Sequence, residues 1–141
     1  MTQQQINLIK SSWAVASSNA SAVGHLFYDR LFEIAPETKA LFGVTVYEQS
    51  DKLGIMLSYI INKLDKLDDI IDEVAKLARQ HANYGVRPGH YTMGGEIFLW
   101  SLEKLFGDLW NEELKEAWTV CYNTLTSAMI DAADYSKLDA A

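Results

Sequence analysis

Hydrophobic residues recur every three to four positions along almost the whole chain, the spacing that places them on one face of an α-helix. A capping-box pattern of Thr2 and Gln5 predicts a first helix through about Ser18. Its apolar face is predicted to hold Ile6, Ile9, Trp13 and Ala16. A second helix is predicted from near Ser21 to Ile34, with an apolar face of Val23, Leu26, Phe27, Leu31 and Ile34.

Pro36 suits the first position of a short helical turn through Leu41. Residues 42–50, "FGVTVYEQS", are predicted to form the first loop, which gives way to a long apolar helix from about Tyr47 to Leu64. The charge-rich run over residues 63–73 then predicts a solvated entry to another helix, which ends at Gly85.

Pro88 opens the region before a helix that runs to about Phe106, and Asn111 caps a last helix through about Ala133. The adjacent Gly94 and Gly95 fall inside the first of these helices without a preceding strand, so we expect them to let another helix approach closely. The pattern predicts an all-α protein of six or seven helices, with a single domain over residues 1–141 and a frayed tail from about residue 134.

Charge narrows the possible partners. The 141 residues carry 12 basic and 19 acidic side chains, a net charge of -7, which repels phosphate backbones and anionic lipid. We therefore expect no nucleic-acid and no membrane partner. Cys121 is the only cysteine, so no internal disulfide or thiolate metal cluster can form. The N-terminus has neither a basic start nor an apolar stretch, so we expect a cytoplasmic protein.

Candidate chemistry is sparse. The chain has no Gly-x-Ser-x-Gly elbow, no His-Glu-x-x-His pair and no phosphate-binding glycine loop. Its three histidines, His25, His81 and His90, are too scattered in helical phase for an ordinary zinc site. Taken alone, His81 on an apolar helix face fits a structural histidine as well as a ligand.

Two segments change this interpretation. "FYDRLFEIAPETKALF" and "ARQHANYGV" resemble segments of the globin family, and the resemblance covers essentially the whole chain. It is greatest to single-domain bacterial globins and the haem domain of flavohaemoglobins, with a likeness to neuroglobin. The resemblance implies a three-on-three globin fold that binds haem b (iron protoporphyrin IX). It places His81 at the iron ligand and Phe42 flat against the porphyrin, and it makes Gly24 and Ser50 the small residues where the second helix crosses the distal helix.

On the distal side, the resemblance places Gln49 over the iron, four residues before Leu53 and on the same helical face. Tyr28 and Gln49 would donate hydrogen bonds to a bound ligand, with Leu53 as an apolar wall. An amide is a poor iron ligand, so we expect a pentacoordinate or water-occupied site rather than bis-histidyl ligation. Lys52 would reach a haem propionate or, after losing its proton, bind iron.

On the proximal side, the residues expected to line the pocket are Leu77, Val86 and Tyr91. Tyr91 matches a tyrosine that forms hydrogen bonds near the proximal histidine in flavohaemoglobins. Those proteins complete this hydrogen-bond network with a glutamate in the last helix. Ungapped counting puts Ala133 at that position here, between Asp131 and Asp134. A carboxylate there would make the imidazole more basic and favour oxygen activation, so its absence argues against that role.

The resemblance leaves several functions open. The first is reversible binding of dioxygen for storage or transport, with carbon monoxide and nitric oxide as further ligands. The second is a nitric oxide dioxygenase that works with a separate reductase, since the chain ends with the globin. A gas or redox sensor and a haem-free globin form a third class.

Overall fold

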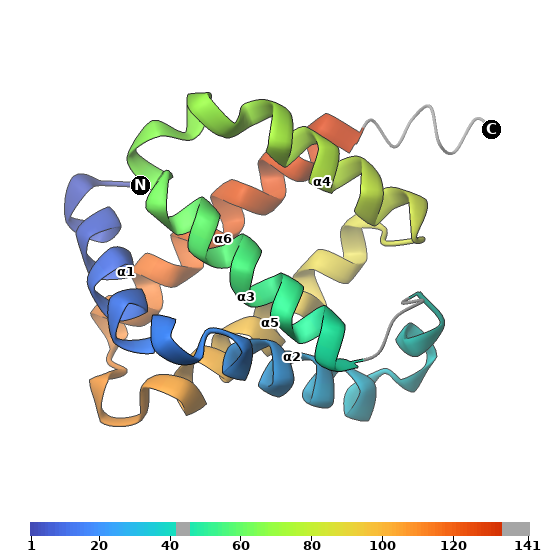
Figure 1. The fold of residues 1–141 in the computed structure, drawn as a ribbon, viewed down its shortest axis with the longest axis horizontal. Helices are drawn as coiled ribbons and strands as arrows, with labels where there is room; N and C mark the ends of the chain where they lie inside the picture. The colour runs from blue at the N-terminus through green and yellow to red at the C-terminus, as the bar shows by residue number, and fades with distance from the viewer. Residues whose placement is uncertain (42–45, 134–141) are drawn as a thin grey trace.

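The computed structural model describes residues 1–41 and 46–133, and these are helical almost throughout (Figure 1). The α-helices are α1 (Gln3–Ala16), α2 (Ser21–Ile34), α3 (Val46–Asn62), α4 (Ile71–Asn83), α5 (Pro88–Phe106) and α6 (Glu112–Ala133). The 3-10 helices are η1 (Ser17–Asn19), η2 (Pro36–Leu41), η3 (Leu64–Ile70) and η4 (Gly107–Leu109). The described residues contain no strand, and none of their helices is long and apolar enough to cross a membrane.

Local capping signals set most of the helix ends. The Thr2 hydroxyl accepts a hydrogen bond from the Gln5 N–H (3.1 Å), and the Gln5 side chain accepts one from the Thr2 N–H (3.0 Å). Asn111 Oδ1 accepts from the Leu114 N–H (2.8 Å) at the start of α6. Gly85 has a φ of 99°, the left-handed conformation that suits a residue just past a helix end. The predicted starts of α1 and α6 and the predicted end near Gly85 are confirmed.

Other predicted boundaries were right only in part. The helix predicted from about Tyr47 is confirmed, since α3 begins at Val46, and residues 46–50 of the overlapping loop prediction are therefore helical. The charged run contains a separate 3-10 segment over Leu64–Ile70, which is itself kinked at Lys66 (φ -140°, ψ 47°). Ile34 is 50% exposed at the end of α2, outside the core to which it was assigned. The tail expected to fray from residue 134 lies outside the described residues.

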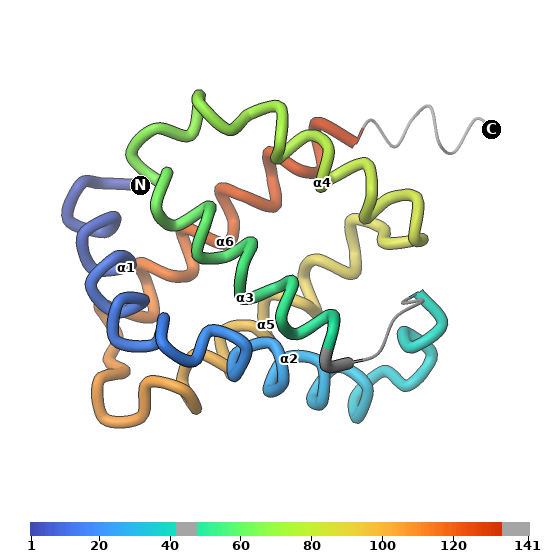
Figure 2. The backbone as a smooth tube through the Cα atoms, viewed as in Figure 1, coloured from blue at the N-terminus to red at the C-terminus, as the bar shows by residue number. Residues whose placement is uncertain are grey.

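The helices pack in two crossing layers. α3 lies across α5 and α6 in Figure 1, while the tube in Figure 2 follows the chain from α3 through η3 to α4. α2 packs against α3 and α5, and α4 packs against α6. Two buried tryptophans join the layers: Trp13 donates a hydrogen bond to Ser58 of α3 (2.9 Å), and Trp118 donates one to Ser12 of α1 (3.1 Å). These bonds tie α1 to both layers.

Small residues make the crossing of α2 over α3 unusually close. A Cβ atom added to Gly24 would lie 2.6 Å from the Cα and carbonyl oxygen of Ser50. A Cβ atom on Gly54 would meet the Ala20 backbone at 2.8 Å. Both distances are well inside ordinary carbon contacts of about 3.5–4.0 Å. The expectation that Gly24 and Ser50 meet at a helix crossing is confirmed, and the crossing lies next to Tyr28 and Gln49.

Candidate functional site

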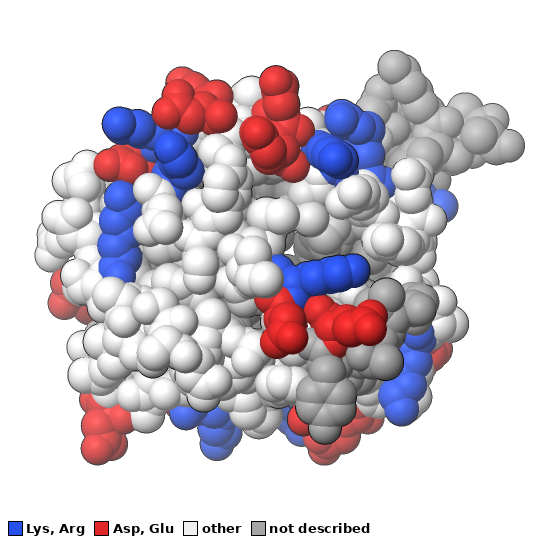
Figure 3. Space-filling view, in the orientation of Figure 1, with Lys and Arg blue, Asp and Glu red and all other residues white. Residues whose placement is uncertain are grey.

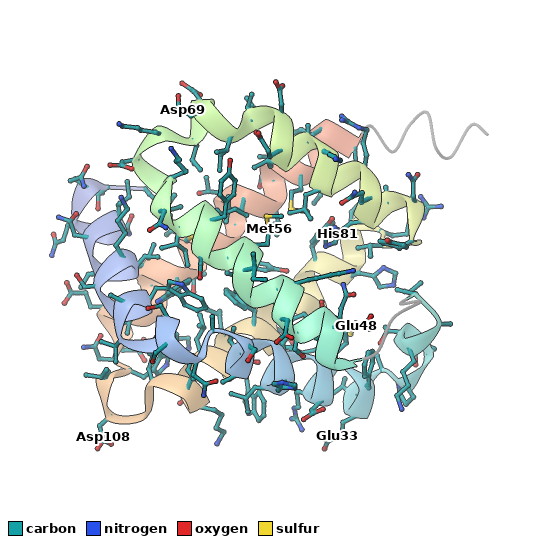
Figure 4. The ribbon with its side chains drawn as sticks, in the orientation of Figure 1. Glu33, Glu48, Met56, Asp69, His81 and Asp108 are labelled. Carbon is teal, nitrogen blue, oxygen red and sulfur yellow. The ribbon has the colours of Figure 1, made fainter. Side chains whose placement is uncertain are left out.

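His81 on α4 offers one nitrogen to a ligand. Its Nδ1 lies 2.8 Å from the Leu77 carbonyl oxygen, and a carbonyl can only accept, so Nδ1 carries the proton. Nε2 makes no hydrogen bond with any described residue. Burial lowers the pKa of the imidazole, and the bond to Leu77 only partly opposes this, so His81 is neutral at pH 7. Figure 4 shows His81 on the side of α4 that faces α3.

Tyr91 of α5 lies beside this imidazole. The two rings are stacked, with centroids 6.4 Å apart and an interplanar angle of 24°. The Tyr122 hydroxyl of α6 donates a hydrogen bond to the Tyr91 carbonyl oxygen at 2.6 Å. The contribution of Tyr122 was missed in the sequence, because it depends on a contact between residues 31 positions apart.

The Gly94–Gly95 pair explains how Tyr122 reaches α5. A Cβ atom on Gly95 would lie 2.7 Å from a ring carbon of Tyr122, and one on Gly94 would lie 3.1 Å from its hydroxyl. The predicted close approach of another helix to this pair is confirmed. The pair therefore indicated that a helix packs closely on α5, although it did not identify Tyr122 as the contacting residue.

The rest of the proximal side is mainly apolar. Leu77 and Val86 are both half-buried, and the Val86 N–H donates to the His81 carbonyl oxygen at 3.0 Å, which ties the turn after α4 to the histidine. Ala133 is buried at the position where flavohaemoglobins were expected to have a glutamate, and Asp131 is exposed. Asp134 lies outside the described residues.

Tyr28 of α2 and Gln49 of α3 form a polar pair in an apolar surrounding. Tyr28 is only 6% exposed, and its ring contacts Phe27 and Phe32 at centroid distances of 5.1 and 6.0 Å. Burial raises the pKa of the Tyr28 phenol, and a hydrogen bond with the half-buried Gln49 side chain offsets the rise in part. The hydroxyl is therefore protonated at neutral pH and able to donate.

Leu53 packs against the small core cluster that contains Tyr28. Leu31 and Phe27, which the sequence placed on the apolar face of the second helix, also belong to this cluster or pack against it. The sequence did not single out Ile97, Phe32 and Met93, which complete the set. Met56, three residues after Leu53 on α3 (Figure 4), packs against the main hydrophobic core. Lys52 is exposed on α3, and Phe42 lies outside the described residues.

The residues present fit a haem group. Within residues 1–41 and 46–133, no three His, Cys, Asp or Glu side chains cluster as metal ligands, so the donor set centres on the single imidazole of His81. One neutral imidazole with a fixed Nδ1 proton is the set that holds haem iron in globins. Figure 3 shows the surface hollowed beside α3, between the side chains of α3 and those of α4.

Comparison with known proteins agrees with this geometry. The family model described as Globin matches residues 25–129. The chain belongs to the globin family, and membership of this family implies haem binding. It is 31% identical over 134 residues to a flavohemoprotein of Vibrio cholerae, covering 93% of this chain and 34% of that protein. The chain thus spans about a third of the flavohemoproteins it matches.

Two solved structures share the fold. A bacterial globin from Campylobacter jejuni is 26% identical, with a TM-score of 0.86 and coverage of 99% of this chain and 100% of that one. An engineered carbene transferase, derived from a putative nitric oxide dioxygenase of Rhodothermus marinus, is 23% identical, with a TM-score of 0.90 and 99% coverage of both chains. The predicted all-α globin fold and the resemblance to bacterial globins and flavohaemoglobins are confirmed.

Proposed function

We propose that this globin holds haem b through His81 Nε2 and binds dioxygen reversibly, for storage or transport in the cytoplasm. The observation that carries the proposal is the buried Tyr28 hydroxyl hydrogen-bonded to Gln49. Haem supplies the iron at which dioxygen and other diatomic ligands bind. Phe42 would pack against its ring, and the exposed Lys52 ammonium would pair with a propionate.

Tyr28 and Gln49 would stabilise the ligand by donating hydrogen bonds. Dioxygen gains partial negative charge on binding, so each donor is charge-assisted and contributes about 1.5–3 kcal/mol when well placed. Because about 1.4 kcal/mol is a factor of ten, one donor slows release by about 10- to 100-fold. Leu53 would close the apolar side of the pocket, and carbon monoxide, which is less polar when bound, would gain less.

On the proximal side, His81 Nδ1 donates to the backbone carbonyl of Leu77. A carbonyl oxygen attracts the Nδ1 proton less strongly than a carboxylate would, so the imidazole stays less basic. Ala133 leaves no carboxylate at the position expected from flavohaemoglobins. This favours holding the ligand over activating it. Leu77, Val86 and Tyr91 would complete the proximal wall.

A nitric oxide dioxygenase is the second candidate, and the relatives favour it. The chain resembles flavohemoproteins over most of its length, and the structural neighbour from Rhodothermus marinus is described as a putative nitric oxide dioxygenase. Conversion of nitric oxide and dioxygen to nitrate consumes one electron per turnover, so this function would require an electron donor. A reductase would therefore be a partner.

Optical spectroscopy tests the proposal directly. We expect a stable oxygenated ferrous form and a five-coordinate deoxy form. Tyr28→Phe and Gln49→Leu should each speed dioxygen release by about 10- to 100-fold, whereas Tyr84→Phe, at a tyrosine that is 59% exposed, should leave release unchanged. A six-coordinate deoxy spectrum, or unchanged release in both distal variants, contradicts the proposal. Rapid nitrate formation sustained by an added reductase would move the assignment to the dioxygenase.

A further inference from the structure

The outer face of α3 carries two exposed hydrophobic side chains that no other described helix covers. Ile55 is 71% exposed and Tyr59 is 39% exposed, and the four-residue spacing puts them on one ridge of the helix. α3 lies in front of α5 and α6 in Figure 1, so this ridge faces solvent. An isolated exposed isoleucine is ordinary, but an adjacent pair on one ridge forms an apolar strip.

Charges of opposite sign end this strip. Asp51 stands four residues before Ile55, and Lys63 stands four residues after Tyr59, one residue past the end of α3. Neither side chain has an ion-pair partner among the described residues. Glu48 and Lys66 continue the same charge order three residues further out at each end. In Figure 3, a basic side chain lies beside the acidic ones near the beginning of α3, and basic and acidic side chains are mixed at the corner where α3 passes into η3.

The order acidic, apolar, apolar, basic along residues 51, 55, 59 and 63 is self-complementary when the ridge is reversed. A two-fold axis at position 57 sets Ile55 of one copy against Tyr59 of the other and Asp51 against Lys63. Such an isologous contact repeats each pair twice. Packing of i±4 ridges at a crossing angle of about 50° keeps the paired ridges side by side along their length.

We propose that this ridge, Asp51–Ile55–Tyr59–Lys63, is the docking surface for a second copy of the same chain in an antiparallel α3–α3 dimer. A parallel arrangement would place Asp51 against Asp51 and Lys63 against Lys63, so the charges select the antiparallel one. Lys52 falls opposite Asn62 in this register, which introduces no like-charge contact. One helical ridge buries little area, so the dimer belongs to the small, weak class of interfaces. The proposal does not depend on haem or on dioxygen binding.

Sedimentation velocity of the full chain, from about 5 μM to about 1 mM, measures the association directly. We expect reversible dimerisation that weakens as salt is raised, because each end pair joins an exposed Asp51 to a half-buried Lys63 at the rim of the contact. Ile55→Glu should weaken it by more than about 30-fold, since the substitution places a charge in both halves of the apolar centre. Leu109→Glu, at a leucine that is 52% exposed in η4, is the matched control and should change nothing.

A charge swap tests the register. Asp51→Lys alone and Lys63→Asp alone should each weaken the dimer by about 10-fold, because each sets like charges together at both ends. The double variant restores the opposite-charge pairs in reversed order and should regain wild-type association. A chain that stays monomeric at 1 mM, or a dimer that Ile55→Glu does not affect, overturns the proposal. A double variant no tighter than the single ones overturns the antiparallel register.

Discussion

The close crossing of α2 and α3 allows Gly24→Ala to test whether helix packing positions the hydrogen-bonded pair Tyr28 and Gln49. The added methyl group would lie 2.6 Å from the Cα and carbonyl oxygen of Ser50 and 2.9 Å from its Cβ. Two of these three atoms belong to the backbone, so no side-chain rotation can relieve the contact. The helices must move apart by roughly 1 Å to restore ordinary contact distances.

The cost can be worked out from two opposing effects. Overpacking of this kind costs about 3 kcal/mol when backbone has to move. Replacing a helical glycine by alanine returns about 1 kcal/mol, because the unfolded chain loses flexibility. The net loss of unfolding free energy is about 2 kcal/mol, or about 6 °C in melting temperature for a chain of this size.

The same movement should reach the distal pair. Tyr28 lies one turn after Gly24 on α2, and Gln49 adjoins Ser50 on α3. A shift of about 1 Å takes a hydrogen bond outside its working range. We therefore expect Gly24→Ala to speed dioxygen release as well as to lower stability.

Urea unfolding followed by circular dichroism measures the stability change, and stopped-flow displacement of dioxygen by carbon monoxide measures ligand release. Gly89→Ala is the matched control, because a Cβ atom there would meet nothing within 4 Å. It should leave release unchanged and raise stability by about 0.5 kcal/mol. A Gly24→Ala protein as stable as the wild type would refute the packing argument. Lower stability with an unchanged release rate would refute only the link to the Tyr28–Gln49 pair.

Three further predictions concern pH and packing. Burial raises the pKa of Tyr28 above its ordinary value near 10, so dioxygen release should be constant between about pH 6 and 9; a rate that rises within this range would contradict it. Burial raises the pKa of Cys121 to about 12, so the free energy of unfolding should fall as the pH rises above 9, the ordinary pKa of the thiol in the unfolded chain. Cys121→Ala should remove the part of this fall that comes from the thiol, as measured by urea unfolding at several pH values. Gly95→Ala should cost about 2 kcal/mol and change the near-ultraviolet circular dichroism, because its Cβ would lie 2.7 Å from the Tyr122 ring; an unaltered aromatic spectrum would show that the ring is not held there.

Local signals predicted much of the helical frame. Four helix starts were predicted from single residues, because a capping residue or a proline acts through its immediate neighbours. These residues are Thr2, Pro36, Pro88 and Asn111. The loop expected over residues 42–50 was wrong from Val46 onward, where it overlapped the helix predicted from about Tyr47. Ser50 is fully buried against Gly24 although nothing in its own neighbourhood indicates burial.

The site was harder to predict from the sequence than the helices, because it depends on contacts between residues far apart in the chain. Periodicity places Gln49, Leu53 and Met56 on one face of α3, but only the fold brings that face to Tyr28 of α2. The stacking of Tyr91 on His81 joins residues from two helices. The bond from Tyr122 to Tyr91 adds a third helix, and the Gly94–Gly95 pair predicted that a helix approaches there but not which residue makes the contact.

The hydrogen bond from His81 Nδ1 to the Leu77 carbonyl also bears on reduction potential. A carboxylate partner gives an imidazole anionic character, which stabilises ferric over ferrous iron and lowers the potential. A peptide carbonyl lends much less negative charge. In this globin the proximal ligand would thus favour the ferrous state, the one that binds dioxygen, and reduce the electron supply needed to keep the protein in it.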